Sequence, residues 1–75
     1  MGDKLPRDLS GRNLINALQR TGFVVRRQRG GHVVMRRSDP YAQVTVPDHR
    51  RIDTGTLDAI LEGAGLSVQE FLQLL

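Results

Sequence analysis

The spacing of apolar residues predicts a helix in the first third of the chain. Ser10 can serve as its N-cap, and Leu14, Ile15 and Leu18 then recur on one helical face. Gly22 follows the last of these positions and is expected to end the helix. The residues after Gly22 are aromatic and β-branched, which favours a strand.

The middle of the chain predicts three antiparallel strands joined by tight turns. The first strand begins at residues 23–25, and Gly30-Gly31 can form a two-residue hairpin turn, after which the second strand starts at His32. Residues 38–41 are turn-forming. Residues 42–46 alternate well enough for a third strand, and the proline that follows stops it because it lacks a backbone donor.

The last third of the chain predicts two further helices, each with a recognisable cap. Asp53 or Thr54 can cap the first of them, and Gly65 is placed to end it in the left-handed conformation. Ser67 and Glu70 form a capping box for a short final helix. Apolar residues of the longer helix share one face and are assigned to the core: Leu57, Ile60, Leu61 and Ala64.

These elements predict an α+β fold of order α-β-β-β-α with a short extra C-terminal helix. Three antiparallel strands have one face to bury, so the helices are expected to cover that face and leave the other open to solvent. The length of 75 residues allows one domain, residues 1–75, with one small core.

The distribution of charge changes this picture more than the formal net charge of +3 does. The segment 20–51 holds eight arginines against two aspartates, a net charge of +6, whereas residues 52–75 hold four acidic residues and no basic one. Ten of the eleven basic residues are arginine, whose planar fork pairs with phosphate, so nucleic acid is the favoured partner. A solubilising surface is the alternative.

Several function classes are excluded or disfavoured. The chain has no cysteine, so disulfides and thiolate metal sites are absent, and a reducing compartment, the cytoplasm, is expected. No apolar run approaches the ~20 residues that a spanning helix needs, so no membrane partner is expected. Two histidines and scattered aspartates predict no metal site, and no small-molecule cofactor is expected.

The candidate chemistry lies in the basic run of residues 26–37, where His32 follows Gly30-Gly31 among arginines. If the two glycines form the turn, Arg29 pairs with His32 and Arg27 with Val34. That register places seven residues on one face of the sheet: Phe23, Val25, Arg27, Arg29, His32, Val34 and Arg36. A shift by one residue would reassign the faces. Both faces mix apolar and basic residues, so the pattern does not say which one meets the helices.

Three pieces of sequence carry a family resemblance. They are Gly22-Phe23 leading into a strand, Gly30-Gly31-His32, and Val46-Pro47-Asp48-His49 leading into Gly55-Thr56-Leu57. In this order and spacing, nearly the whole chain resembles the HicA family of bacterial toxins, which are mRNA interferases with a double-stranded-RNA-binding-domain-like fold. The family usually has Gly-Ser-His at the hairpin, so Gly31 stands in place of a serine and removes a hydroxyl.

The resemblance implies a function. The chain is expected to be the toxin of a type II toxin–antitoxin system, a metal-independent endoribonuclease that cleaves mRNA in the cytoplasm with a single catalytic histidine, matching His32. A cognate HicB-like antitoxin is expected to bind and block it. Residue pattern alone would favour a surface histidine beside a turn, and the resemblance reverses that preference.

The expected chemistry assigns roles to the residues around His32. Histidine has an ordinary pKa of about 6.5 and suits a general base or acid at physiological pH. Arginines supply positive charge to the reacting phosphate, and two glycines let the backbone approach it. The candidate RNA-binding residues are Arg26, Arg27, Arg29, Gly30, Gly31, Arg36, Arg37 and His49.

Alternatives remain at this point. His49 can supply a phosphate contact or a proton, or it can be a loop histidine hydrogen-bonded to backbone. The same basic hairpin also fits a non-catalytic RNA-binding module, or a protein-interaction module in which the arginines bind an acidic partner.

Overall fold

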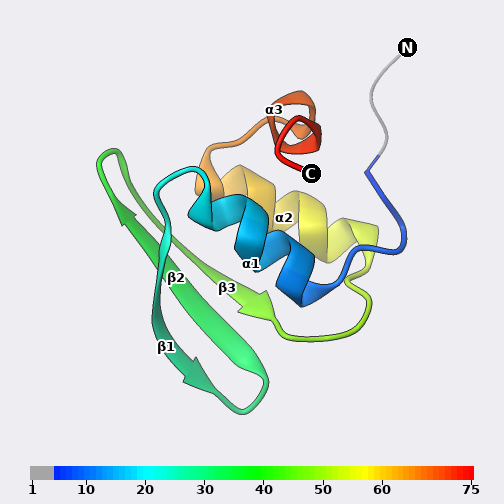
Figure 1. The fold of residues 1–75 in the computed structure, drawn as a ribbon, viewed down its shortest axis with the longest axis horizontal. Coiled ribbons are helices and arrows are strands. Elements are labelled where there is room, and N and C mark those ends of the chain that lie inside the picture. Colours follow the sequence, from blue (N-terminus) through cyan, green and yellow to red (C-terminus); the bar gives the residue numbers. More distant parts are fainter. Residues whose placement is uncertain (1–4) are drawn as a thin grey trace.

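The computed structural model describes residues 5–75 and has the predicted element order (Figure 1). The antiparallel sheet has the strand order β1-β2-β3, and the architecture is consistent with a double-stranded-RNA-binding-domain-like fold. The elements are α1 (Gly11–Gln19), β1 (Val24–Arg29), β2 (His32–Ser38), β3 (Tyr41–Pro47), α2 (Thr54–Ala64) and α3 (Val68–Leu72).

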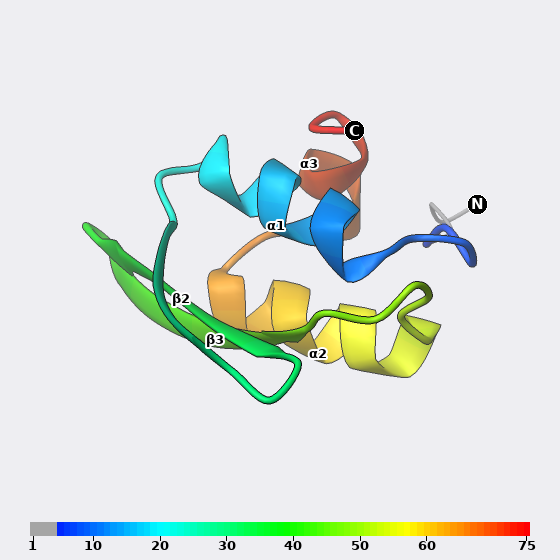
Figure 2. The same ribbon diagram turned by 60° about the horizontal axis from the view of Figure 1, so that its bottom comes forward.

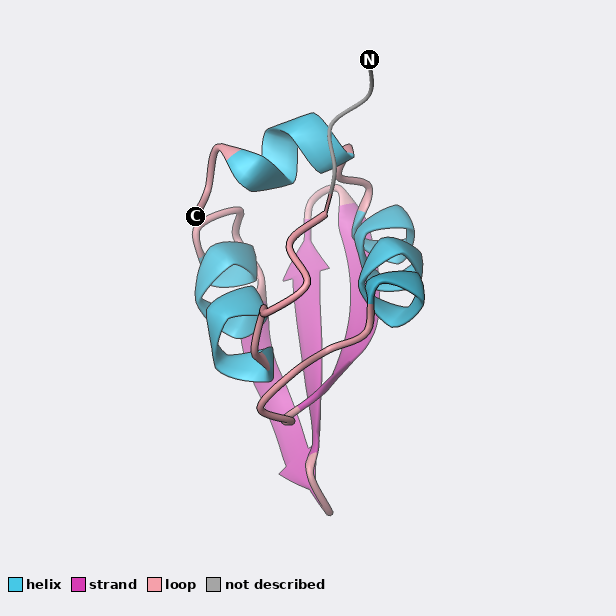
Figure 3. Ribbon diagram, turned by 90° about the vertical axis from the view of Figure 1, so that its right-hand side faces the viewer, coloured by secondary structure: helices cyan, strands magenta, loops and turns pink. Residues whose placement is uncertain are grey.

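The helices lie on one side of the sheet, as expected from its single hydrophobic face. Figure 3 shows α1 and α2 side by side in front of the strands, with α3 across one end. Figure 2 shows the β1–β2 hairpin extending away from the helices. The opposite side of the sheet, hereafter the open face, carries no covering element among the described residues.

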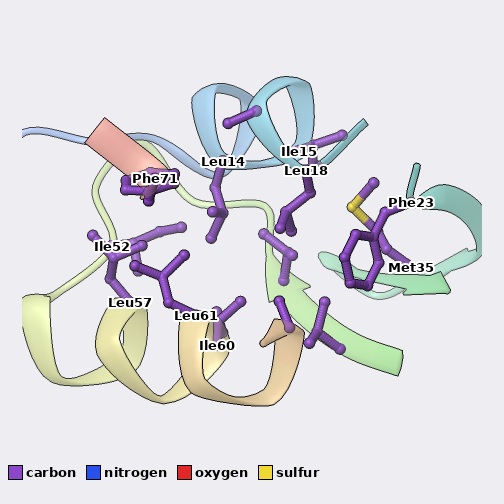
Figure 4. Close-up of a cluster of buried hydrophobic side chains, with 14 of the residues drawn as sticks. Leu14, Ile15, Leu18, Phe23, Met35, Ile52, Leu57, Ile60, Leu61 and Phe71 are labelled. Carbon is purple, nitrogen blue, oxygen red and sulfur yellow. The ribbon is translucent and has the colours of Figure 1, made fainter. Parts of the chain in front are cut away.

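The core forms between the helices and the middle of the sheet (Figure 4). α1 contributes Leu14 and Leu18, α2 contributes Leu57 and Leu61, and Phe71 of α3 closes one end of the cluster. The predicted stripe of α2 is therefore confirmed. From the sheet, the buried side chains are Val33, Met35, Val44 and Val46.

The structure confirms the predicted helix caps. The Ser10 side chain accepts a hydrogen bond from the Asn13 amide, and Asp53 rather than Thr54 caps α2. Gly65 adopts a left-handed φ of 75° at the end of α2. The expectation that Gly22 ends the first helix is confirmed, because α1 stops at Gln19 and Gly22, with a left-handed φ of 95°, lies in the turn that follows. The Phe23 amide donates to the Leu18 carbonyl at 3.2 Å across this turn.

The register of the hairpin is confirmed near the turn and corrected away from it. Arg29 pairs with His32 and Arg27 with Val34, as expected for a two-residue turn. A bulge between Val25 and Arg27 then inserts Arg26, so that Val25 lies opposite Met35, and neither Val25 nor the buried Phe23 shares the face of His32. An unpaired extra residue reverses the faces of the strand beyond it.

Candidate functional site

His32 is the first residue of β2 and lies on the open face at the end of the sheet. Its cross-strand neighbours are Arg29 on β1 and Pro47 on β3. Gly30 and Gly31 have φ values of 55° and 80°, the sign that a type I′ turn requires at both central positions. A Cβ atom added at either glycine would meet nothing within 4 Å, so the space around the turn beside His32 is open.

Three of the predicted arginines share the open face with His32. Arg29 pairs directly with His32, Arg27 pairs with Val34, and Arg36 follows two residues later along β2. Arg26 lies in the bulge and is exposed. The open face therefore combines one histidine with a row of guanidinium groups, which is a surface suited to an anionic chain.

A loop of residues 48–53 begins directly beside His32 and is held by backbone hydrogen bonds. The Asp48 amide donates to the Gly31 carbonyl at 2.7 Å, which ties the loop to the hairpin turn. The Gly11 amide donates to the His49 carbonyl at 2.9 Å, and the Ile52 amide donates to the Leu9 carbonyl at 2.8 Å. These three contacts join the loop, the hairpin and the start of α1.

The loop brings His49, the second histidine, close to His32. The two imidazole ring centroids are 6.5 Å apart with an interplanar angle of 62°. Both side chains border a cleft of about 350 Å³ between the end of the sheet and the N-terminus of α2. The residues that line this cleft are His32, Thr45, Pro47, His49, Arg51, Ile52, Asp53 and Thr56.

Comparison with known families shows to which protein family this chain belongs. A family model described as HicA toxin of bacterial toxin-antitoxin matches residues 11–66, which is more than half of the chain. The chain belongs to the HicA toxin family. It is thus a toxin of a bacterial toxin–antitoxin system, and the predicted resemblance is confirmed. A search of curated proteins found no match.

One predicted binding residue of this HicA chain is directed elsewhere. Arg37 lies on the helix side of the sheet, and its guanidinium stacks over the Phe23 ring at 4.7 Å from the centroid. Its Nε donates to the Pro40 carbonyl at 2.8 Å and one terminal nitrogen donates to the Ala64 carbonyl at 3.1 Å. Arg37 therefore joins β2 to the end of α2, away from His32.

The cleft of the HicA chain also contains residues that the sequence reasoning did not select. Arg51 brings a cation beside the two histidines, while Thr45 and Thr56 bring hydroxyl groups. Arg51 could have been predicted from the pairing of His32 with Pro47 at the end of β3. This pairing places the loop after β3, which contains Arg51, next to His32.

Asp53 is the acidic residue of the cleft. The Thr56 hydroxyl donates to its carboxylate at 2.6 Å and the Thr56 amide donates at 3.2 Å. These hydrogen bonds lower the pKa of Asp53 below its ordinary value of 3.8, so the carboxylate is charged at neutral pH. Asp53 limits where an anionic ligand can lie, because a phosphate is repelled from that wall of the cleft.

Among residues 5–75, no three histidine, aspartate or glutamate side chains converge as a group that could hold a metal ion. Over the same residues, no helix has the length and apolar character needed to cross a membrane.

Proposed function

We propose that this HicA toxin is an endoribonuclease that cleaves mRNA without a metal ion and that His32 is its catalytic histidine. The observation that carries the proposal is the position of His32, at the mouth of a cleft and on the same face as Arg27, Arg29 and Arg36. HicA toxins generally act on RNA as nucleases, which agrees with a basic open face.

The proposed reaction is an attack of the ribose 2′-oxygen on the adjacent phosphorus. The bond from phosphorus to the 2′-oxygen forms, the bond to the 5′-oxygen breaks, and the products are a 2′,3′-cyclic phosphate and a 5′-hydroxyl. His32 either takes the proton of the 2′-hydroxyl or gives one to the leaving 5′-oxygen. The arginines stabilise the extra negative charge on phosphorus, and the exposed backbone at Gly30-Gly31 lets the RNA strand approach.

The proposal includes a HicB-like antitoxin that covers the same surface. A cognate antitoxin follows from membership of a toxin–antitoxin family. The arginines of the open face favour an antitoxin with acidic residues at the contact, because such a protein would compete directly with RNA for the same guanidinium groups.

The experiment is RNA cleavage by the purified chain in EDTA, compared with His32→Ala. We expect the wild type to shorten RNA and the variant to lose about 10²-fold to 10⁴-fold in rate, the usual contribution of a positioned acid or base. Tyr41→Ala is the matched control, since Tyr41 is also an exposed ring on the open face but lies at the far end of the sheet. Circular dichroism checks that each variant is folded.

The outcomes separate the rival functions. Undiminished cleavage by His32→Ala would remove His32 from the mechanism. Salt-dependent RNA binding without cleavage by the wild type would instead identify a non-catalytic RNA-binding module. The absence of both activities would favour a module that binds only an acidic protein.

A further inference from the structure

Building on the proposed ribonuclease function, we infer that His49 is a second catalytic residue, the proton-transfer partner of His32. The cleavage reaction moves two protons, one from the attacking 2′-hydroxyl and one to the leaving 5′-oxygen. These two oxygens lie on opposite sides of the phosphorus in an in-line displacement. One histidine in hydrogen-bond reach of each oxygen serves both transfers without reorganisation.

The geometry of the two rings is compatible with one histidine acting as the base and the other as the acid. Their centroids are 6.5 Å apart and their planes are inclined at 62°, so the imidazoles do not stack face to face. Both border the same cleft, whose volume of about 350 Å³ accommodates a nucleotide unit. A phosphodiester bound there, with hydrogen bonds of about 2.8 Å, meets one ring from the sheet and the other from the loop.

The backbone of His49 is held independently of its side chain. Its carbonyl accepts a hydrogen bond from the Gly11 amide, and the preceding residue Asp48 is bonded through its amide to Gly31 in the turn next to His32. Arg12 adds an ion pair to Asp48 at 3.8 Å. These contacts thus fix the backbone of His49 without involving its side chain. The imidazole remains exposed at the cleft.

Titratable and charged groups from several elements lie at the cleft or next to His49. His32 comes from β2, Arg51 from the same loop, and Asp53 from the cap of α2. Asp48 neighbours His49 in the chain and is paired with Arg12 of α1. The cycle is balanced in protons: a neutral histidine becomes imidazolium, an imidazolium becomes neutral, and exchange with water restores both.

The first test compares His49→Ala and His49→Gln with the wild type in EDTA. We expect both variants to lose about 10²-fold to 10⁴-fold in the cleavage rate constant, because glutamine can hydrogen-bond to a phosphate but cannot exchange a proton at neutral pH. The wild-type rate should rise and then fall with pH, and each variant should lose one limb of that curve. Thermal unfolding of both variants should match the wild type.

The second test uses an oligoribonucleotide in which sulfur replaces the bridging 5′-oxygen at one cleavage site. A thiolate leaves without protonation, so removing the general acid has little effect on this substrate. We expect one of the two variants, His32→Ala or His49→Ala, to recover near wild-type cleavage and the other to remain slow. The variant that recovers identifies the acid, and the other histidine is then the base.

These outcomes separate a failure of the proposed His32–His49 pair from a failure of the proposed ribonuclease function. A wild type that does not cleave RNA would overturn both proposals. Cleavage that depends on His32 but persists within a few-fold in His49→Gln would overturn only the pair, as would recovery of both alanine variants or of neither on the sulfur substrate.

Discussion

The two outer strands of the sheet flank the same central strand but have opposite surroundings. β3 buries Val44 and Val46 beneath the helices, and Gly63 of α2 lies close enough for an added Cβ atom to contact Val44 at 3.4 Å. β1 is exposed at all six positions, including Val24 and Val25 at 53% and 43%. β1 is therefore an edge strand without helical cover.

This difference separates the part of the sheet that is buried in the core from the part that carries the arginines proposed to bind RNA. Burial of apolar surface, the main source of stability, is concentrated between β2, β3 and the helices. β1 instead presents arginines and interrupts its pairing with a bulge, both of which discourage edge-to-edge association. Substitutions on the two sides of β2 should therefore have different consequences.

The largest expected effect contrasts Met35→Ala with Val25→Ala, two residues that face each other across β1 and β2. Met35 is fully buried, so its truncation should lower the free energy of unfolding by about 2–5 kcal/mol. Val25 is 43% exposed, so its truncation should change that energy by about 0.5 kcal/mol or less. Urea denaturation measures both, and equal losses would contradict the division between the strands.

A smaller effect is expected at the start of α1, where the helix contacts the His49 loop. A Cβ atom at Gly11 would overlap the Pro47 carbonyl oxygen and approach the Asp48 Cα to 2.9 Å. Gly11→Ala should therefore cost about 1–3 kcal/mol of stability, as overpacked sites do. It should also slow cleavage by displacing His49.

Gly63→Ala is the matched control for Gly11→Ala, because it makes the same change inside an exposed stretch of α2. Its Cβ would make an ordinary contact with Val44, so we expect a gain of about 0.5–1 kcal/mol from the lower entropy of the unfolded chain. A Gly11→Ala protein as stable as this control would show that the close approach to the loop does not matter.

Arginines on the two faces of the sheet should also differ in what they contribute to RNA binding and to stability. Arg29→Gln should reduce the slope of log affinity for RNA against log salt by about one and leave stability unchanged. Arg37→Gln should leave that slope unchanged and cost about 1 kcal/mol of stability, because it removes the contacts with Phe23, Pro40 and Ala64. Filter binding at several salt concentrations, together with urea denaturation, tests the contrast.

The smallest effect concerns acid stability at the cap of α2. The pKa of Asp53 is lowered first by the Thr56 hydroxyl and then by the Thr56 amide, so its contribution is present above the ordinary value of 3.8. The contribution is lost as the pH falls through the lowered pKa, because the unfolded chain takes up the proton first. Asp53→Asn keeps the cap but not the titration, so its urea midpoint should fall less than that of the wild type between about pH 6 and pH 3.

Local features of the fold were predictable from the sequence because they depend on neighbouring residues. The capping box of Ser67 and Glu70, the left-handed Gly65 and the Gly30-Gly31 turn each need only a few adjacent positions. The bulge at Arg26 was not predictable, because an edge strand without helical cover has no apolar alternation to fix its register.

His32 and the positive charge of the candidate site were predictable from the sequence. The way in which distant segments come together at the site was not. His32 and the arginines follow from one hairpin, which is local. The approach of His49 depends on the pairing of His32 with Pro47 and on two backbone hydrogen bonds of the loop, one donated to the Leu9 carbonyl and one accepted from the Gly11 amide. Leu9 and Gly11 are distant from the loop in sequence. The structural use of Arg37 likewise depends on Ala64, 27 residues away.

The most direct test of the account measures cleavage and unfolding side by side for His32→Ala. His32 is exposed at the end of the sheet and contributes nothing to the core. We predict an unfolding midpoint equal to that of the wild type, together with RNA cleavage about 10²-fold to 10⁴-fold slower in EDTA. Undiminished cleavage, or a loss of cleavage that parallels a loss of stability, would contradict it.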